Sequence, residues 1–211
     1  MSFKDLKQEK EEILPELMLK YEFAMDTLKT QLNILIKEFS FRNDYNPVEH
    51  IKCRIKSEDS ALNKLKSKGY DLTIFNIINH VHDMIGIRIV CSFLSDVYDI
   101  VNMIKISGQI KIKEEKDYIK YPKKSGYSSY HLIVMVPIYL HDSIEYVEAE
   151  IQVRTIAMDF WASLEHKIQY KIPKDLPKKV SDELYQCSLN MMALDNRMNQ
   201  LNKFINEFEN E

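Results

Sequence analysis

The chain has 211 residues, of which 45% are hydrophobic and 29% charged, as expected of a globular protein with one substantial core. Its formal net charge of −3 provides no overall basic field, so nucleic-acid binding would need a local cationic patch. The three cysteines are widely spaced without a C-x-x-C pair, which argues against a disulfide framework or structural zinc and predicts a reducing, cytoplasmic compartment. We expect no signal peptide in the charged start MSFKDLKQEKEE, and no apolar run is long enough for a membrane span.

Two long segments show the alternating four- and three-residue apolar spacing of packed helices. The first runs over residues 14–39, and we expect it to cover a sheet. The second runs over residues 180–208, where nothing that follows could cover it, so we expect it to help build an oligomer. We predict one domain over 1–211, divided into an N-terminal helix at 1–42, a catalytic core at 43–172 and a C-terminal helix at 175–211. Pro173 and Pro177 separate the core from the last helix.

The segment between the long helices mixes helical and strand patterns. A short helix over 60–69 is expected to end at Gly69, and a later helix to begin at a Ser95 cap and end near Gly108. Strands are predicted over 84–93, 109–120, 131–139 and 143–155, the last of them followed by a helix. The predicted fold class is therefore α/β, with a mixed β-sheet flanked by helices.

The stretch KKSGYSSYHLIVMVPI, residues 123–138, has the composition of a ligand loop that enters a buried strand. Gly126 permits a sharp turn or a close backbone approach. Lys123 precedes it as a point charge suited to phosphate, Tyr127 offers a ring on which a base can stack, and His131 opens the strand. The alternative is a polar turn with a surface tyrosine.

A second cationic cluster lies in CRIKSEDSALNKL, residues 53–65. Arg54 and Lys56 precede a predicted helix, and Ser60 and Lys64 share one face of it because they are four residues apart. A helix start with nearby cations is an anion site. The alternative is a solvated basic face.

Carboxylates and further cations lie on two predicted strands. Asp83 and Arg88 flank the start of one strand, and Glu150, Gln152 and Arg154 alternate along another. A carboxylate beside cations can hold Mg²⁺ or accept a proton from a hydroxyl. The alternatives are a turn residue and a solvated edge strand. Two cationic clusters, an aromatic platform and two carboxylates are together what phosphoryl-type transfer between two nucleotides requires.

These stretches, with HDMIGIRIVC, KDYIKYPKKSGYSSYHL and EAEIQVRTIAMDFWASLEHKIQYK, resemble in order and spacing the synthetase domain of RelA/SpoT homologues, specifically the stand-alone small alarmone synthetases. The resemblance covers roughly residues 40–175 and, less specifically, the long flanking helices. It implies a nucleotidyltransferase-like fold that transfers pyrophosphate from ATP to the 3′-hydroxyl of a guanosine nucleotide, giving (p)ppGpp and AMP. It also implies Mg²⁺ as cofactor and a tetramer built through the long helices.

The resemblance assigns Arg54 and Arg88 to sandwiching the adenine of ATP. Asp83 and Glu150 match the Mg²⁺ carboxylates, with Glu150 also placed to activate the 3′-hydroxyl. The residues that resemble contacts to the ATP phosphates are Lys56, Ser60 and Lys64.

On the acceptor side, the resemblance assigns Tyr127 to stacking on guanine and Asp159 to reading the guanine edge. The residues that resemble contacts to the acceptor phosphates are Lys116, Lys123 and His131. Gln152 and Arg154 resemble supporting residues of the same site.

Some features depart from the longer relatives or leave the function open. The chain has no room for the His-Asp hydrolase domain of those relatives, so we expect synthesis without hydrolysis. The acceptor motif EEKD at 114–117 is a hybrid of two known forms, which leaves GMP, GDP and GTP open as acceptors. The rival functions are a toxin that pyrophosphorylates the 3′ end of tRNA and a non-catalytic RNA-binding regulator.

Overall fold

The computed structural model describes residues 3–171 and 176–209, which form one five-stranded sheet and six helices. The strands are β1 (Val48–Ile55), β2 (Ile85–Cys91), β3 (Lys111–Asp117), β4 (Tyr130–Tyr139) and β5 (Ile144–Thr155). The helices are α1 (Phe3–Asn43), α2 (Glu58–Ser67), α3 (Ile74–His80), α4 (Leu94–Ser107), α5 (Ile156–Lys171) and α6 (Lys178–Glu209). No helix in these ranges is long and apolar enough to cross a membrane.

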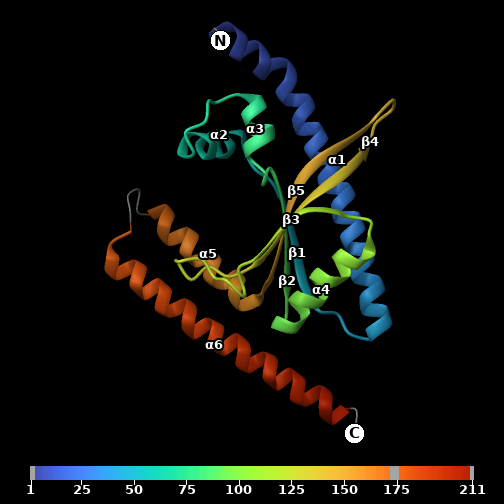
Figure 1. The fold of residues 1–211 in the computed structure, drawn as a ribbon, viewed down its shortest axis with the longest axis vertical. Helices are drawn as coiled ribbons and strands as arrows, with labels where there is room; N and C mark the ends of the chain where they lie inside the picture. Colours follow the sequence, from blue (N-terminus) through green and yellow to red (C-terminus); the bar gives the residue numbers. More distant parts are fainter. Residues whose placement is uncertain (1–2, 172–175, 210–211) are drawn as a thin grey trace.

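The sheet is mixed, with strand order β1-β2-β5-β4-β3. The β2–β5 pair is parallel and the other three pairs are antiparallel. In Figure 1 the sheet is seen close to its edge, with α1 and α4 on one side and α2, α3 and α5 on the other. The predicted fold class, a mixed sheet flanked by helices, is confirmed.

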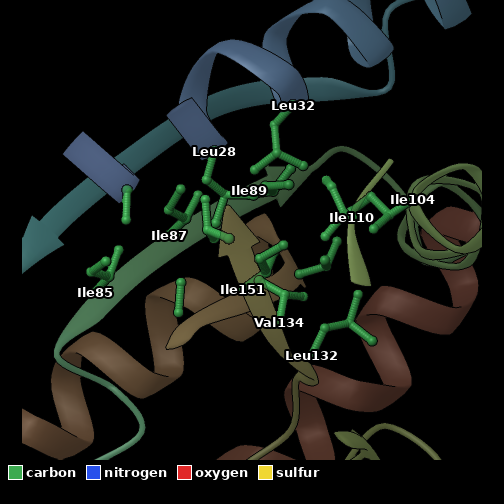
Figure 2. Close-up of a cluster of buried hydrophobic side chains, with 14 of the residues drawn as sticks. Leu28, Leu32, Ile85, Ile87, Ile89, Ile104, Ile110, Leu132, Val134 and Ile151 are labelled. Carbon is green, nitrogen blue, oxygen red and sulfur yellow. The ribbon is translucent and has the colours of Figure 1, made fainter. Parts of the chain in front are cut away.

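The core lies between one face of the sheet and helices α1 and α4. Leu28 and Leu32 of α1 are fully buried against alternate residues of the central strands (Figure 2). Because side chains alternate between the faces of a strand, every second residue of β2, β4 and β5 belongs to this core. Its strand members include Ile85, Ile87, Ile89, Leu132, Val134 and Ile151. The N-terminal apolar seam therefore covers the sheet, as predicted, and leaves the opposite face for polar side chains.

Two elements were not predicted, β1 and α3. Arg54 lies on β1 and Lys56 lies in the connection after it. The helix of this segment begins at Glu58. Ser57 is its N-cap, because its hydroxyl accepts a hydrogen bond from the Ser60 backbone N–H. The helix was predicted to end at Gly69, but it ends at Ser67 with Lys68 as its C-cap. Gly69 follows in the left-handed region at φ +77°.

The predicted Ser95 cap of α4 is wrong. The helix begins at Leu94, and the Asp96 carboxylate reaches back to accept a hydrogen bond from the Phe93 backbone N–H at 3.0 Å. The Ser95 N–H instead donates to the Asn199 side chain on α6. A carboxylate in the first turn outcompetes the hydroxyl here because its charge also suits the helix N-terminus.

Helix α6 is joined to the rest of the protein by side-chain hydrogen bonds. The Trp161 indole N–H donates to the Leu184 carbonyl, and the Thr155 hydroxyl donates to the buried Asp195 carboxylate at 2.6 Å. The C-terminal half of its predicted apolar seam stays exposed in the single chain. The exposed members are Leu194, Met198, Leu201, Ile205 and Phe208. Pro173, predicted as part of the break before this helix, lies outside the described residues.

Candidate active site

The candidate site is built from two rows of residues that cross the polar face of the sheet. Strand register pairs the members of each row directly across neighbouring strands. The first row is Lys52, Arg88, Gln152, His131 and Lys116. The second row is Arg54, Gly86, Glu150, Ile133 and Glu114. Because the two rows are two residues apart along β1, β2, β4, β5 and β3, they lie on one face.

Two cavities open on this face and meet at the carboxylates. The first, of about 330 Å³, is lined by Lys52, Arg54 and Arg88 and is called here the donor cavity. The second, of about 460 Å³, is called the acceptor cavity. Its lining includes Lys64, Lys116, Lys123, Tyr127 and His131. Asp83, Glu150 and Gln152 line both cavities, so two ligands bound side by side would meet at these residues.

Asp83 lies in the connection before β2 and pairs with two lysines. Its two carboxylate oxygens lie 2.9 Å from Lys56 Nζ and 2.8 Å from Lys64 Nζ. Burial alone raises the pKa of this carboxyl, but the hydrogen bonds from the lysines outweigh it and hold the pKa below its ordinary value. Asp83 is therefore ionised at neutral pH. Ser60 lies one turn before Lys64, where its hydroxyl pairs with the Ser57 hydroxyl.

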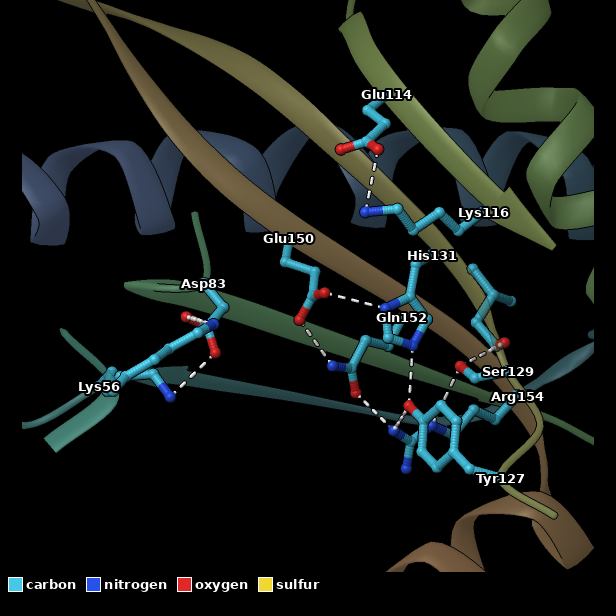
Figure 3. A network of polar contacts seen from close by, with 12 residues as sticks. Lys56, Asp83, Glu114, Lys116, Tyr127, Ser129, His131, Glu150, Gln152 and Arg154 are labelled. Atoms are coloured by element: carbon cyan, nitrogen blue, oxygen red, sulfur yellow. Dashed lines mark hydrogen bonds and ion pairs between the residues drawn. The ribbon is translucent and has the colours of Figure 1, made fainter. Parts of the chain in front are cut away.

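Glu150 is held by two neighbours on the sheet (Figure 3). Its Oε1 lies 2.9 Å from His131 Nδ1, and its Oε2 accepts a hydrogen bond from the Gln152 amide at 2.7 Å. Desolvation raises the pKa of Glu150, but the His131 contact and the Gln152 hydrogen bond more than offset it, so the pKa is lowered. The carboxylate is thus charged and fixed in orientation between the two cavities.

Tyr127 forms one wall of the acceptor cavity. Its Oη lies 2.8 Å from His131 Nε2 and accepts a hydrogen bond from Arg154 Nη2 at 2.5 Å. Lys123 Nζ lies 4.7 Å from the ring centroid. Burial raises the pKa of Tyr127. The ring is accordingly held by its hydroxyl end.

Gly126 is required by both conformation and space. Its φ is +89°, in the left-handed region, and a Cβ there would meet Ser188 Oγ of α6 at 2.0 Å. The loop before Tyr127 therefore turns directly against α6.

Arg154 and Asp159 lie next to residues that line the cavities. Within the described part of the chain, the lining of each cavity contains neither of these two residues. Asp159 Oδ1 lies 2.8 Å from Arg88 Nη1 and 3.4 Å from Arg154 Nη1. The structure thus places Asp159 between two guanidinium groups. The guanine-reading role that the resemblance gave it stays a prediction. Lys56 and Ser60 also lie outside the two linings, beside Asp83 and on α2.

The structure adds lining residues that sequence reasoning did not assign to a role. Lys52 extends the donor cavity beyond Arg54, and Glu165 and Gln169 of α5 face the acceptor cavity. The signals were the alternation of Lys52 with Arg54 on β1 and the four-residue spacing of Glu165 and Gln169 on a helix. Neither pattern indicates a binding site unless β1 is known to be a strand and α5 is known to pack against β5.

Asp83 and Glu150 are suited to a hard cation. The structure holds no cluster of three or more His, Cys, Asp or Glu side chains within its described ranges that could bind a metal without help. Mg²⁺, however, is commonly held by one or two carboxylates together with substrate phosphates and water. Two ionised carboxylates shared by two cationic cavities fit that requirement.

Two cavities with cationic linings that share Asp83 and Glu150 on one face of a mixed sheet are suited to group transfer between two anionic ligands. The chain belongs to the family described as the region found in RelA / SpoT proteins, which matches residues 53–175. It is similar to the GTP pyrophosphokinase YwaC of Bacillus subtilis, with 47% identity over 194 residues that span 92% of each chain.

Solved structures agree with this assignment. The crystal structure of small alarmone synthetase 2 from Bacillus subtilis superposes with a TM-score of 0.82 at 46% identity, covering 91% of this chain and 99% of that one. The structure of small alarmone synthetase 1 from the same organism, bound to its product pppGpp, gives a TM-score of 0.84 at 31% identity, covering 91% and 97%. The predicted family is confirmed.

Proposed function

We propose that this chain is a GTP pyrophosphokinase that transfers pyrophosphate from ATP to the 3′-hydroxyl of a guanosine nucleotide, giving (p)ppGpp and AMP. The observation that carries the proposal is the meeting of the donor and acceptor cavities at Asp83 and Glu150. The names of the similar proteins, a GTP pyrophosphokinase and small alarmone synthetases, point to the same reaction. Its substrates place the enzyme in the cytoplasm.

ATP binds in the donor cavity. Arg54 and Arg88 hold the adenine between their guanidinium planes, which stack well on aromatic rings. Its phosphates extend from that cavity toward Asp83, where the side chains that receive them are Lys56, Ser60 and Lys64, the last of which lines the acceptor cavity. Lys56 and Lys64 already bracket Asp83, so the phosphates lie next to the carboxylates.

The guanosine nucleotide binds in the acceptor cavity. Its base stacks on Tyr127. Arg154 supports that wall by donating to Tyr127 Oη, and Gln152 supports it by accepting a hydrogen bond from Arg154. The side chains that receive its phosphates are Lys116, Lys123 and His131. Lys116 is paired with Glu114 at 2.9 Å, so an incoming phosphate competes with that carboxylate.

Glu150 acts as the general base. Its lowered pKa keeps it ionised at neutral pH, and His131 and Gln152 hold both oxygens in place. Glu150 takes the proton of the 3′-hydroxyl, whose oxygen attacks the β-phosphorus of ATP while the bond to the α-phosphate oxygen breaks and AMP leaves. Mg²⁺ held by Asp83 and Glu150 would neutralise charge on the transferred group.

We also propose that the chain assembles into an oligomer, a tetramer by resemblance, through the exposed seam of α6. Leu194, Met198 and Leu201 are each about half exposed or more in the single chain. Apolar side chains that recur at heptad spacing are typically covered by another helix. Sedimentation velocity of the purified chain would test this, and a monomer at micromolar concentration would contradict it.

An acceptor panel tests the function. Purified protein, Mg²⁺ and ATP labelled on its terminal phosphates are incubated with GMP, GDP, GTP or deacylated tRNA, and the products are resolved by chromatography. Label on a guanosine nucleotide together with AMP release supports the proposal and names the acceptor. Label on tRNA alone would indicate the toxin, and tight RNA binding without transfer would indicate the regulator. Incubating the product without ATP tests the expected lack of hydrolysis.

A further inference from the structure

Asp159, in the first turn of α5, connects the two cavities although it lines neither. Its Oδ1 accepts hydrogen bonds from Arg88 Nη1 on β2 at 2.8 Å and from Arg154 Nη1 on β5 at 3.4 Å. Arg88 lines the donor cavity, and Arg154 in turn donates to Tyr127 Oη in the acceptor cavity at 2.5 Å. One carboxylate oxygen is therefore the shared acceptor between a donor-side and an acceptor-side arginine.

The acceptor-side part of this bridge is buried. The side chains of Arg154 and Asp159 are only 3% and 12% exposed. A buried guanidinium needs a carboxylate partner, and Asp159 is the one with which Arg154 pairs in the described part of the chain. Arg154 also donates to Ser129 Oγ and Gln152 Oε1, so a shift of Asp159 would act on a hydrogen-bonded group that extends to the acceptor cavity.

The donor end of the bridge is less constrained. The Arg88 side chain is 27% exposed, and within the described ranges its buried Nε has no hydrogen-bond partner. The hydrogen bond from Arg88 Nη1 to Asp159 is accordingly the polar contact that orients the Arg88 guanidinium. A ligand that packs on the Arg88 guanidinium therefore selects the orientation in which Asp159 is held as well.

We infer that Asp159 is a positioning residue through which binding in the donor cavity and binding in the acceptor cavity favour each other. This inference rests on the proposed function. ATP fixes Arg88, Arg88 fixes Asp159, and Arg154 then holds the Tyr127 ring ready for the guanosine base. The acceptor consequently loses less conformational freedom when ATP is already bound, and by linkage the same factor applies to ATP binding.

The test measures binding without turnover. Dissociation constants of a non-hydrolysable ATP analogue and of GDP are measured by calorimetry with Mg²⁺, each alone and with the other ligand at saturation. The parent protein is expected to bind each ligand about fivefold or more tightly in the presence of the other, by the same factor in both directions. Equal dissociation constants with and without the second ligand would overturn the inference and leave the proposed function standing.

Variants separate positioning from direct contact. Asp159→Ala and the bulkier Asp159→Leu both remove the shared acceptor. The coupling factor, which is the ratio of a ligand's dissociation constants without and with the second ligand, is therefore expected to fall to within about twofold of one, whatever affinity each variant keeps for a single ligand. Asp159→Asn retains an amide oxygen that can accept both hydrogen bonds but loses the carboxylate charge, so it should keep part of the coupling. Ser129→Ala is the matched control, because it removes a different Arg154 hydrogen bond and should leave the coupling intact.

Other outcomes decide against the inference. Unchanged coupling in Asp159→Leu would show that the bridge is not used. A large loss of GDP affinity with the coupling factor retained would assign Asp159 to direct guanine contact instead. If thermal unfolding shows that neither Asp159→Ala nor Asp159→Leu folds, the coupling factors of the parent and of Asp159→Asn still test the inference. Both factors must exceed one, and a factor of one in either protein would overturn it. Failure of the parent to bind either nucleotide would overturn the proposed function itself.

Discussion

Nδ1 of His131 lies 2.9 Å from Oε1 of Glu150, and the other nitrogen of the same ring lies 2.8 Å from Tyr127 Oη. A single imidazole thus joins the proposed general base to the proposed base-stacking ring. The contact follows from strand register, because His131 pairs with Gln152 and its diagonal neighbour on β5 is Glu150. His131 therefore positions both the Tyr127 ring, on which the guanine is proposed to stack, and the Glu150 carboxylate, which is the proposed general base.

Glu150→Gln should lower kcat by about 10²–10⁴-fold while ATP affinity changes little, because the charge is lost in the transferring step. Single-turnover kinetics and analogue binding measure the two effects separately. Glu148→Gln is a matched control on the same face of β5, where Glu148 pairs with His82 and Lys113 outside both cavities. Normal turnover in Glu150→Gln would refute its role as general base.

Tyr127→Ala should raise the acceptor KM roughly tenfold or more and leave the ATP KM nearly unchanged, because base–aromatic stacking is worth about 1–3 kcal/mol. Tyr127→Phe keeps the ring and loses only the hydroxyl contacts to His131 and Arg154, so its acceptor KM should rise less. Steady-state kinetics with each substrate varied in turn gives both constants. An acceptor KM that is the same in parent and Ala variant would exclude stacking.

Asp83→Asn should reduce thermal stability at neutral pH, and the deficit should shrink in acid. The folded pKa of Asp83 lies below its ordinary value of 3.8, so the unfolded chain binds the proton more readily. The stabilisation by Lys56 and Lys64 is therefore present above that value and is lost as pH falls through the lower folded pKa. Thermal unfolding from pH 7 to pH 3 measures the gap between parent and variant. A gap that widens with acid would contradict this sign.

Gly126→Ala should destabilise the fold by on the order of 1–3 kcal/mol, because alanine is strained at positive φ. Steric conflict adds to this, since the new Cβ would meet Ser188 Oγ at 2.0 Å and Ser188 Cβ at 2.5 Å. Ser188→Gly removes both atoms, so the double variant should recover the steric part but not the conformational part. Denaturant unfolding of the four proteins gives the cycle, and strictly additive losses would show that the loop does not press on α6.

The sequence by itself predicted the apolar pattern of α1, most strands, the glycine-dependent loop and the ordered motifs that carry the family. These are local signals, since each depends on spacing within one segment. The segment over β1 was misread because its charged residues preceded an evident helix, and its alternation is too short to decide between strand and loop. The Ser95 cap failed for a related reason, since the helix begins one residue before Ser95 and only the backbone path decides where its first turn starts.

Only the tertiary structure decided which of the polar residues meet. Lys52, Arg88 and Gln152 lie far apart in the sequence and become direct cross-strand neighbours through the β1–β2 and β2–β5 pairings. The same register brings Glu150 between the two cavities, and the position of α5 puts Asp159 beneath both. Local periodicity determines which face a side chain occupies within its own strand. Strand order and register depend on burial summed over the whole core, so the sequence of one segment cannot specify its partners across the sheet.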